Sequence, residues 1–171
     1  MVRSTPKRIT RPYLEHAALA YLERFSSSAE NLRRVLMRKV ERSCRHHGED
    51  PGDHAGLVAE VVQRCAGAGL VDDRRYAEGR VASLRRRGGS ARAIAAALDR
   101  KGVERDVVEA VLAADETDDA AAARAFARRR RIGPYRTGDR TAYREKDLAA
   151  FARAGFGYAT ARAVLDGGAE D

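Results

Sequence analysis

The sequence predicts an all-α protein of three tandem three-helix (helix-turn-helix-like) repeats that form an elongated, curved rod. Three observations predict this class. Alanine and arginine, both good helix formers, are abundant. Apolar residues recur at helical spacing along most of the chain, and one three-helix pattern returns with a period of about sixty residues. Because repeats this small cannot each bury an apolar face alone, we expect stacked neighbours to bury it together.

The first repeat is expected over residues 13–69, after a disordered basic tail over residues 1–12. The apolar positions of its first helix, predicted over residues 12–25, are Leu14, Ala18, Leu22 and Phe25. Ser27 or Ser28 is expected to cap the second helix, since a serine hydroxyl can accept from a free backbone N–H there. A histidine-containing loop then leads to the third helix.

The second repeat, over residues 70–114, shows the pattern most clearly. Asp72 and Asp73 predict the N-cap and first turn of a helix over residues 73–87. Ser90 is expected to cap the next helix. A left-handed glycine, Gly102, is expected to end it.

The second helices of these two repeats align without a gap. The paired positions are Ser28 with Ser90, Leu32 with Ile94, Leu36 with Leu98, and Lys39 with Lys101. The cap, two core positions and a basic residue therefore fall in register, which is typical of an internal repeat.

The third repeat, expected over residues 118–167, is looser. Its first two helices are predicted over residues 120–131 and 146–154, with an inserted loop over residues 133–141 between them. The acidic segment 115–119 is expected to act as a hinge before it.

A motif in fixed order runs through the central repeat. It consists of GLVDDRRYAE at residues 69–78, RRGGS at 86–90 and LDRKGV at 98–103. This motif resembles the RecX family of regulators of the RecA recombinase, and FARAGF at residues 151–156 is similar to the end of that family. The resemblance implies a non-enzymatic protein of three three-helix units that docks in the groove of the RecA–DNA filament and spans neighbouring protomers. It further implies that strand exchange and ATP hydrolysis are dampened and that filament disassembly is favoured.

Arginine-rich segments are the candidate partner-binding surfaces. Arg85–Arg87 end a helix, where cations stabilise the negative end of the helix dipole; three consecutive arginines cannot share one face, so at least one should point outward. Arg128–Arg131 lie in a stretch, residues 120–137, that has no acidic residue, and Tyr135 is expected to stack on a base or ring. The candidates are Arg33, Arg34, Arg38, Lys39, Arg85, Arg86, Arg87, Arg92, Lys101, Arg128, Arg129, Arg130, Arg131, Tyr135 and Arg136.

Other chemistries have little support in the sequence. A catalytic role for Asp72 and Asp73 is not favoured, because no histidine or nucleophile accompanies them. The sequence holds no phosphate-binding or dinucleotide-binding glycine motif, so no cofactor is expected. The possible ligands Cys44, His46, His47 and His54 have a spacing that fits no common zinc finger, so no metal site is expected.

The composition and the resemblance lead to one expectation and two alternatives. The 171 residues carry a formal net charge of +8, which favours anionic partners, although a GC-rich genome would also enrich arginine. Cys44 and Cys65 lack framework spacing, and no stretch is as long as a membrane span, so we expect a cytoplasmic monomer with free thiols. We expect it to regulate a RecA-type filament in DNA repair, recombination and the SOS response, with weak, non-specific contact to single- or double-stranded DNA. The alternatives are a non-specific helical-repeat DNA-binding protein that acts without recombinase and an adaptor for another acidic protein.

Overall fold

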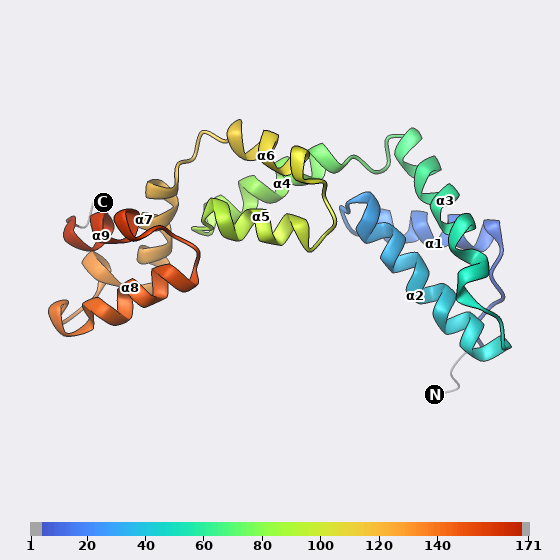
Figure 1. The fold of residues 1–171 in the computed structure, drawn as a ribbon, viewed down its shortest axis with the longest axis horizontal. Coiled ribbons are helices and arrows are strands. Elements are labelled where there is room, and N and C mark those ends of the chain that lie inside the picture. The colour runs from blue at the N-terminus through green and yellow to red at the C-terminus, as the bar shows by residue number, and fades with distance from the viewer. Residues whose placement is uncertain (1–4, 169–171) are drawn as a thin grey trace. The chain divides into compact units, whose positions relative to one another are not determined.

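A computed structural model describes residues 5–168, and that part of the chain contains helices and no strand (Figure 1). The helices are α1 (Arg11–Leu22), α2 (Ala29–His47), η1 (Pro51–His54), α3 (Ala55–Gly67), α4 (Asp73–Arg86), α5 (Ala91–Asp99), α6 (Arg105–Ala113), α7 (Asp119–Arg130), η2 (Gly133–Tyr135), η3 (Thr141–Tyr143), α8 (Arg144–Arg153) and α9 (Tyr158–Asp166), where η marks a 3-10 helix. The predicted all-α class is confirmed. Within the same range, none of the helices combines the length and the apolar character needed to cross a bilayer.

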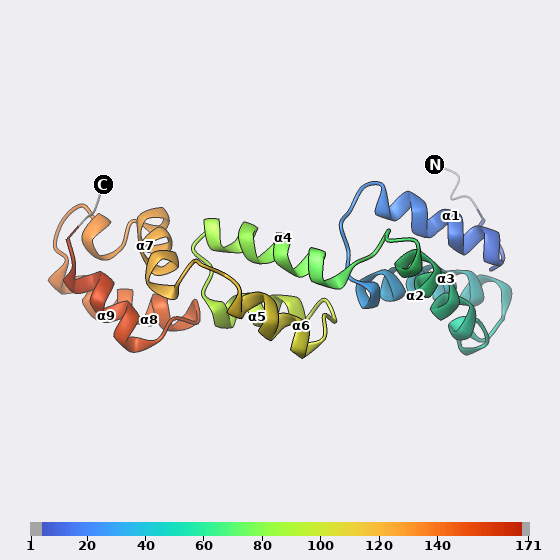
Figure 2. The ribbon, with the colours of Figure 1, turned by 90° about the horizontal axis from the view of Figure 1, so that it is seen from above.

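The chain divides into two compact units. The first extends to Tyr76 and also takes in Lys101–Val103, whereas the second comprises Ala77–Arg100 and the chain from Glu104 onward. The first unit contains α1, α2 and α3, and the second contains most of α4 and all of α5 to α9, whose order along the chain can be followed in Figure 2. The two units are therefore described separately.

The first unit has its core between α1, α2 and α3. Leu14, Leu32, Leu36 and Val58 are fully buried there; each such side chain contributes about 1.5–3 kcal/mol by leaving water. The predicted cap of α2 is confirmed at Ser28, whose hydroxyl accepts from the backbone N–H of Asn31 at 3.2 Å. The helical spacing in the sequence thus identified the buried face of α2.

Two predictions at the start of the chain need correction. The helix α1 ends at Leu22, so Phe25 lies beyond it and is 50% exposed instead of belonging to the apolar face. The predicted tail is ordered against α2 over its described residues: Ile9 is buried, and the Ser43 hydroxyl donates to the Lys7 carbonyl at 2.8 Å. Residues 1–4 of the predicted tail lie outside the described part.

The second unit contains two groups of helices. In the first, α5 and α6 bury Ile94, Leu98 and Val111. In the second, α7, α8 and the turn before α9 bring three aromatic rings together: Phe126, Phe151 and Phe156 have centroids 5.3–5.7 Å apart. Such aromatic pairs add about 0.5–1.5 kcal/mol to the effect of burial.

Both capping serines make a second, longer-range hydrogen bond. Within the first unit, the Ser28 hydroxyl donates to the carbonyl oxygen of Lys101. Within the second unit, the Ser90 hydroxyl donates to the carbonyl oxygen of Ala154 at 2.7 Å. Because Ser28 aligns with Ser90, both repeats have a capping serine whose hydroxyl also donates to a carbonyl oxygen far away in the sequence.

Candidate partner-binding surfaces

The second helix of the first repeat, α2, presents four exposed cationic side chains. They are Arg33, Arg34, Arg38 and Lys39. Leu32 and Leu36 face the core, and residues that follow them by one or two positions point away from it because a helical turn takes 3.6 residues. The local sequence therefore accounts for the exposure of Arg33, Arg34 and Arg38.

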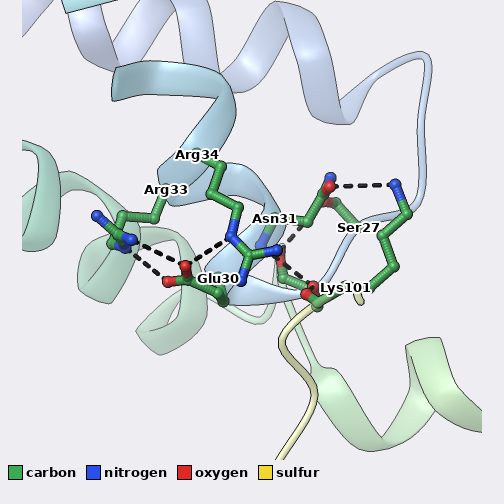
Figure 3. Close-up of polar contacts among 7 residues, drawn as sticks. Ser27, Glu30, Asn31, Arg33, Arg34 and Lys101 are labelled. Carbon is green, nitrogen blue, oxygen red and sulfur yellow. Dashed lines mark hydrogen bonds and ion pairs between the residues drawn. The ribbon is translucent and has the colours of Figure 1, made fainter. Parts of the chain in front are cut away.

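A carboxylate in the first turn of α2 holds two of these arginines (Figure 3). Glu30 accepts from the Nε of Arg33 at 2.6 Å and from the Nε of Arg34 at 2.8 Å. The hydrogen bond from Arg33, followed by that from Arg34, lowers the pKa of Glu30 to about 2 against the opposing effect of burial. The pairing orders both guanidinium groups on the helix surface while leaving them partly exposed.

Lys101 has a structural partner in the same unit. Its ammonium group donates to the Asn31 side-chain oxygen at 3.2 Å, and the Asn31 amide in turn donates to the Ser27 hydroxyl at 2.8 Å (Figure 3). The side chain is half-buried. Lys101 therefore helps to hold its segment against the start of α2.

The prediction of a partner contact at Arg85 is wrong. The side chain is only 7% exposed, and it donates to Asp115 and to Asp119 at 2.6 Å each. Burial alone would lower the pKa of Arg85, but the hydrogen bonds to Asp119 and Asp115 outweigh that effect and raise it. The segment predicted to be a hinge thus supplies two carboxylates that bind Arg85.

Three neighbours of Arg85 in the second repeat are exposed as predicted. They are Arg86, Arg87 and Arg92. Of the three consecutive arginines, only Arg85 is buried. Successive side chains on a helix point in different directions, so the three cannot share one environment.

The run Arg128–Arg131 is exposed at the C-terminal end of α7. Arg131 ends the helix in a left-handed conformation with φ of 54°. The guanidinium group of Arg128 lies over the ring of Tyr135, 5.5 Å from its centroid. One face of the Tyr135 ring is therefore occupied by Arg128. Tyr135 is also half-buried, and its hydroxyl oxygen is fully enclosed. Its placement does not support the predicted stacking role.

Arg136 also has a structural role that the sequence did not reveal. It donates to the Oδ1 of Asp147 at 2.6 Å, and the Oδ2 of Asp147 accepts from the backbone N–H of Gly133 at 2.9 Å. Asp147 is buried. The pair fixes the inserted loop on α8, so Arg136, predicted as a candidate contact for a partner or DNA, has a structural partner in the chain itself.

The residues that sequence reasoning missed are mainly acidic partners. Asp115 and Asp119 lie 30 and 34 positions from Arg85, a separation at which no local pattern indicates pairing. Glu30 could have been found, because it precedes Arg33 and Arg34 by the three and four positions that place side chains together on a helix.

Comparison with known proteins identifies similar chains over nearly the whole length. The family model for the second three-helix domain of RecX matches residues 72–112. The chain is 42% identical over 165 residues to the regulatory protein RecX of Myxococcus xanthus (strain DK1622), which covers 94% of this chain and 88% of that protein. It is 35% identical over 154 residues to the regulatory protein RecX of Agrobacterium fabrum (strain C58 / ATCC 33970), covering 90% and 82%. A third such protein, from Halorhodospira halophila (strain DSM 244 / SL1), is 39% identical over 124 residues, covering 72% and 69%.

Proposed function

Because the chain belongs to the RecX family of regulatory proteins, we propose that it binds the filament that a RecA-type recombinase forms on DNA. Binding inhibits the recombinase and ATPase activities of the filament and thereby modulates DNA repair and recombination. The protein acts by binding, in the cytoplasm, and needs no chemistry of its own.

The observation that supports this proposal is the recurrence of exposed cations on every predicted repeat, residues 13–69, 70–114 and 118–167. The exposed candidates are Arg33, Arg34, Arg38, Lys39, Arg86, Arg87, Arg92, Arg128, Arg129, Arg130 and Arg131. Guanidinium groups bind phosphates and carboxylates in a bidentate manner. A surface of this kind suits a polymer whose protein and nucleic-acid groups offer repeated anions.

Repetition also explains how weak contacts become sufficient. Each exposed ionic contact contributes only about 0.2–1 kcal/mol. Once one repeat is bound, the next acts at a high effective concentration, which raises the overall affinity without any stronger contact. A filament offers such repeated positions, whereas a single recombinase molecule does not.

The first test follows ATP hydrolysis by RecA assembled on single-stranded DNA while the protein is titrated in. The proposal expects inhibition at or below one molecule per filament protomer. Unchanged hydrolysis at that ratio would contradict it.

A pair of matched variants tests the arginine surface. Arg129→Ala with Arg130→Ala leaves Arg128 over Tyr135 and leaves the helix-ending Arg131 in place. This double variant should bind the filament about 10-fold more weakly, with unchanged helicity by circular dichroism. The control, Arg105→Ala with Arg162→Ala, removes the same charge from two exposed arginines that pair with carboxylates on their own helices. An equal loss in both variants would show that total charge, and not this surface, is responsible.

Salt dependence separates the proposal from the alternative of a plain DNA-binding protein. Strong binding to naked DNA, with a steep loss of affinity as salt rises, would favour the alternative. Weak binding to naked DNA with retained binding to the coated strand supports the filament as the target.

A further inference from the structure

Three side chains of the kinds that bind transition metals meet where α2 ends. Cys44 lies in the last turn of α2, Glu49 follows the helix, and His54 ends η1. The Cys44 sulfur, a Glu49 carboxylate oxygen and a His54 ring nitrogen all lie within 4.8 Å of one another. Glu49 escaped the sequence-based reasoning, which considered only the cysteine and the histidines of this region.

The other two histidines point elsewhere. His46 is exposed, and the Nε2 of His47 lies 2.9 Å from the carbonyl oxygen of Pro6. The cluster therefore contains Glu49 in place of His46 and His47, which the sequence suggested as possible ligands.

Local backbone structure brings the three ligands together. Gly48 adopts a left-handed conformation with φ of 71°, so that the N–H groups of Gly48 and Glu49 both donate to the Cys44 carbonyl oxygen. Asp50 then accepts from the Gly52 N–H at 2.8 Å and caps η1. The ligands are thus carried by one short segment whose backbone is hydrogen-bonded at both turns.

The distance between His54 and Glu49 is close to the one that a tetrahedral ion requires. His54 Nε2 and Glu49 Oε2 are 3.4 Å apart. Two nitrogen or oxygen ligands at zinc are about 3.3 Å apart, and a sulfur–nitrogen pair about 3.6 Å, if the bonds are about 2.0–2.3 Å long. The Cys44 sulfur lies within 4.8 Å of the other two ligand atoms. Small side-chain rotations would bring it to the sulfur–nitrogen distance that zinc requires.

The surroundings favour a cation. The carboxylates of Glu49, Asp50 and Asp53 act electrostatically on Cys44. Negative groups of this kind would stabilise a dication bound beside the sulfur. Arg8 is ion-paired with the Oε1 of Glu49, which leaves the Oε2 facing His54.

We propose that Cys44, Glu49 and His54 bind one divalent transition-metal ion of the zinc class. The ligand atoms are the Cys44 Sγ, one carboxylate oxygen of Glu49 and the Nε2 of His54, and a water fills the fourth position. A thiolate and an imidazole select this class over magnesium or calcium, which prefer oxygen ligands. Binding breaks the S–H bond of Cys44, and the proton passes to solvent.

The exposure of the three ligand side chains indicates where the water ligand would bind. Cys44 is enclosed, whereas the side chains of Glu49 and His54 are 27% and 20% exposed, so the open side of the cluster faces solvent. A bound ion would link the end of α2 to η1, and through it to α3, and would stabilise the first unit.

Cobalt(II) is the spectroscopic probe for this site. The full-length protein is first treated with a chelator and a reductant, and Co²⁺ is then titrated in. We expect thiolate-to-cobalt charge-transfer absorption, tetrahedral ligand-field bands in the visible region and saturation at one ion per chain. Zn²⁺ should then abolish the bands and, at about 100 times its dissociation constant, raise Tm by roughly 5 °C or more.

Two variants and two controls decide the assignment. Cys44→Ser and His54→Ala should each weaken Zn²⁺ binding by more than the roughly 10–100-fold loss that removal of an outer-shell partner causes. Cys65→Ser removes the other buried thiol, and His46→Ala removes an exposed neighbouring imidazole; both should bind the metal as the parent protein does. Because Cys44→Ser could also perturb the core, His54→Ala with a native circular dichroism spectrum provides the independent measurement.

Three outcomes would overturn the proposal. The first is the absence of charge-transfer absorption in the parent protein at micromolar Co²⁺. The second is absorption that survives in folded His54→Ala, and the third is absorption that disappears in Cys65→Ser. The loss pattern described above, with one ion per chain, supports it.

Discussion

The hydroxyl of Ser90 spans two elements: it accepts from the N–H of Ala93 at 3.1 Å and donates to the carbonyl oxygen of Ala154 at 2.7 Å. One side chain therefore caps α5 and holds the end of α8 beside it. Ser28 has the corresponding pair of hydrogen bonds in the first unit. This use of the cap explains why serine stands at the same point of both repeats.

We expect Ser90→Ala to lower the free energy of unfolding by about 1–3 kcal/mol. The variant loses a helix cap and leaves the half-buried carbonyl oxygen of Ala154 without this donor. Chemical denaturation measures the change. Ser26→Ala is the control, since Ser26 is exposed and is not the cap of α2; an equal effect in both variants would show that the contact with Ala154 is of no consequence.

Gly155→Ala should destabilise the protein by about 1–3 kcal/mol. Gly155 has φ of +87°, and a Cβ there would lie 2.7 Å from the Ser90 hydroxyl oxygen. Gly79→Ala should have the opposite sign, a gain of about 0.5–1 kcal/mol, because Gly79 is inside α4 with open space around it. Thermal unfolding of both variants distinguishes the two effects, and a stabilising Gly155→Ala would be inconsistent with the packing.

Arg85→Met should cost about 3 kcal/mol of stability while Arg86→Met stays within about 0.5 kcal/mol. Methionine keeps much of the apolar contact of the Arg85 side chain but leaves Asp115 and Asp119 without their cation. Denaturant titration of the pair provides the comparison. Similar values for both variants would mean that the buried ion pair makes no net contribution.

The pH dependence of stability should show the pairing of Glu30. Its pKa lies at about 2 in the folded protein instead of 4.5, because its carboxylate accepts from Arg33 and Arg34. The stabilisation is therefore fully present above pH 4.5 and is lost as the pH falls toward 2. We expect on the order of 1 kcal/mol, reduced by salt, since the pair is near the surface. The difference in Tm between the parent protein and Glu30→Gln should shrink over that interval; a constant difference would exclude this origin.

Much of the secondary structure could be predicted, because its determinants lie within a few residues of each other. The caps at Ser28, Ser90 and Asp72 and the left-handed Gly102 are where the sequence indicated. Phe25 was misplaced because helical spacing does not show where a helix stops. Phe25 and the serine run that follows it lie outside any helix, between α1 and α2.

The candidate surface was predicted less well than the helices. Arg33 and Arg128 are exposed, as candidate partner contacts should be, but Arg85 and Arg136, which were also candidates, pair with carboxylates of the chain itself. An arginine is available to an outside partner only if no carboxylate of its own chain holds it in a buried pair. Such pairing depends on distances between residues far apart in the sequence, which the sequence does not give.

Composition, periodicity and capping signals, which are local, were enough to predict an all-α protein, and the motif over residues 69–103 carried its resemblance to the RecX family. Only the folded structure shows that Arg85 forms ion pairs with Asp115 and Asp119. It also shows that Cys44 lies beside Glu49 and His54. The reason is physical: an ion pair or a metal cluster requires side-chain atoms within a few ångströms. Helix packing and loop geometry bring such atoms together, and sequence spacing alone does not.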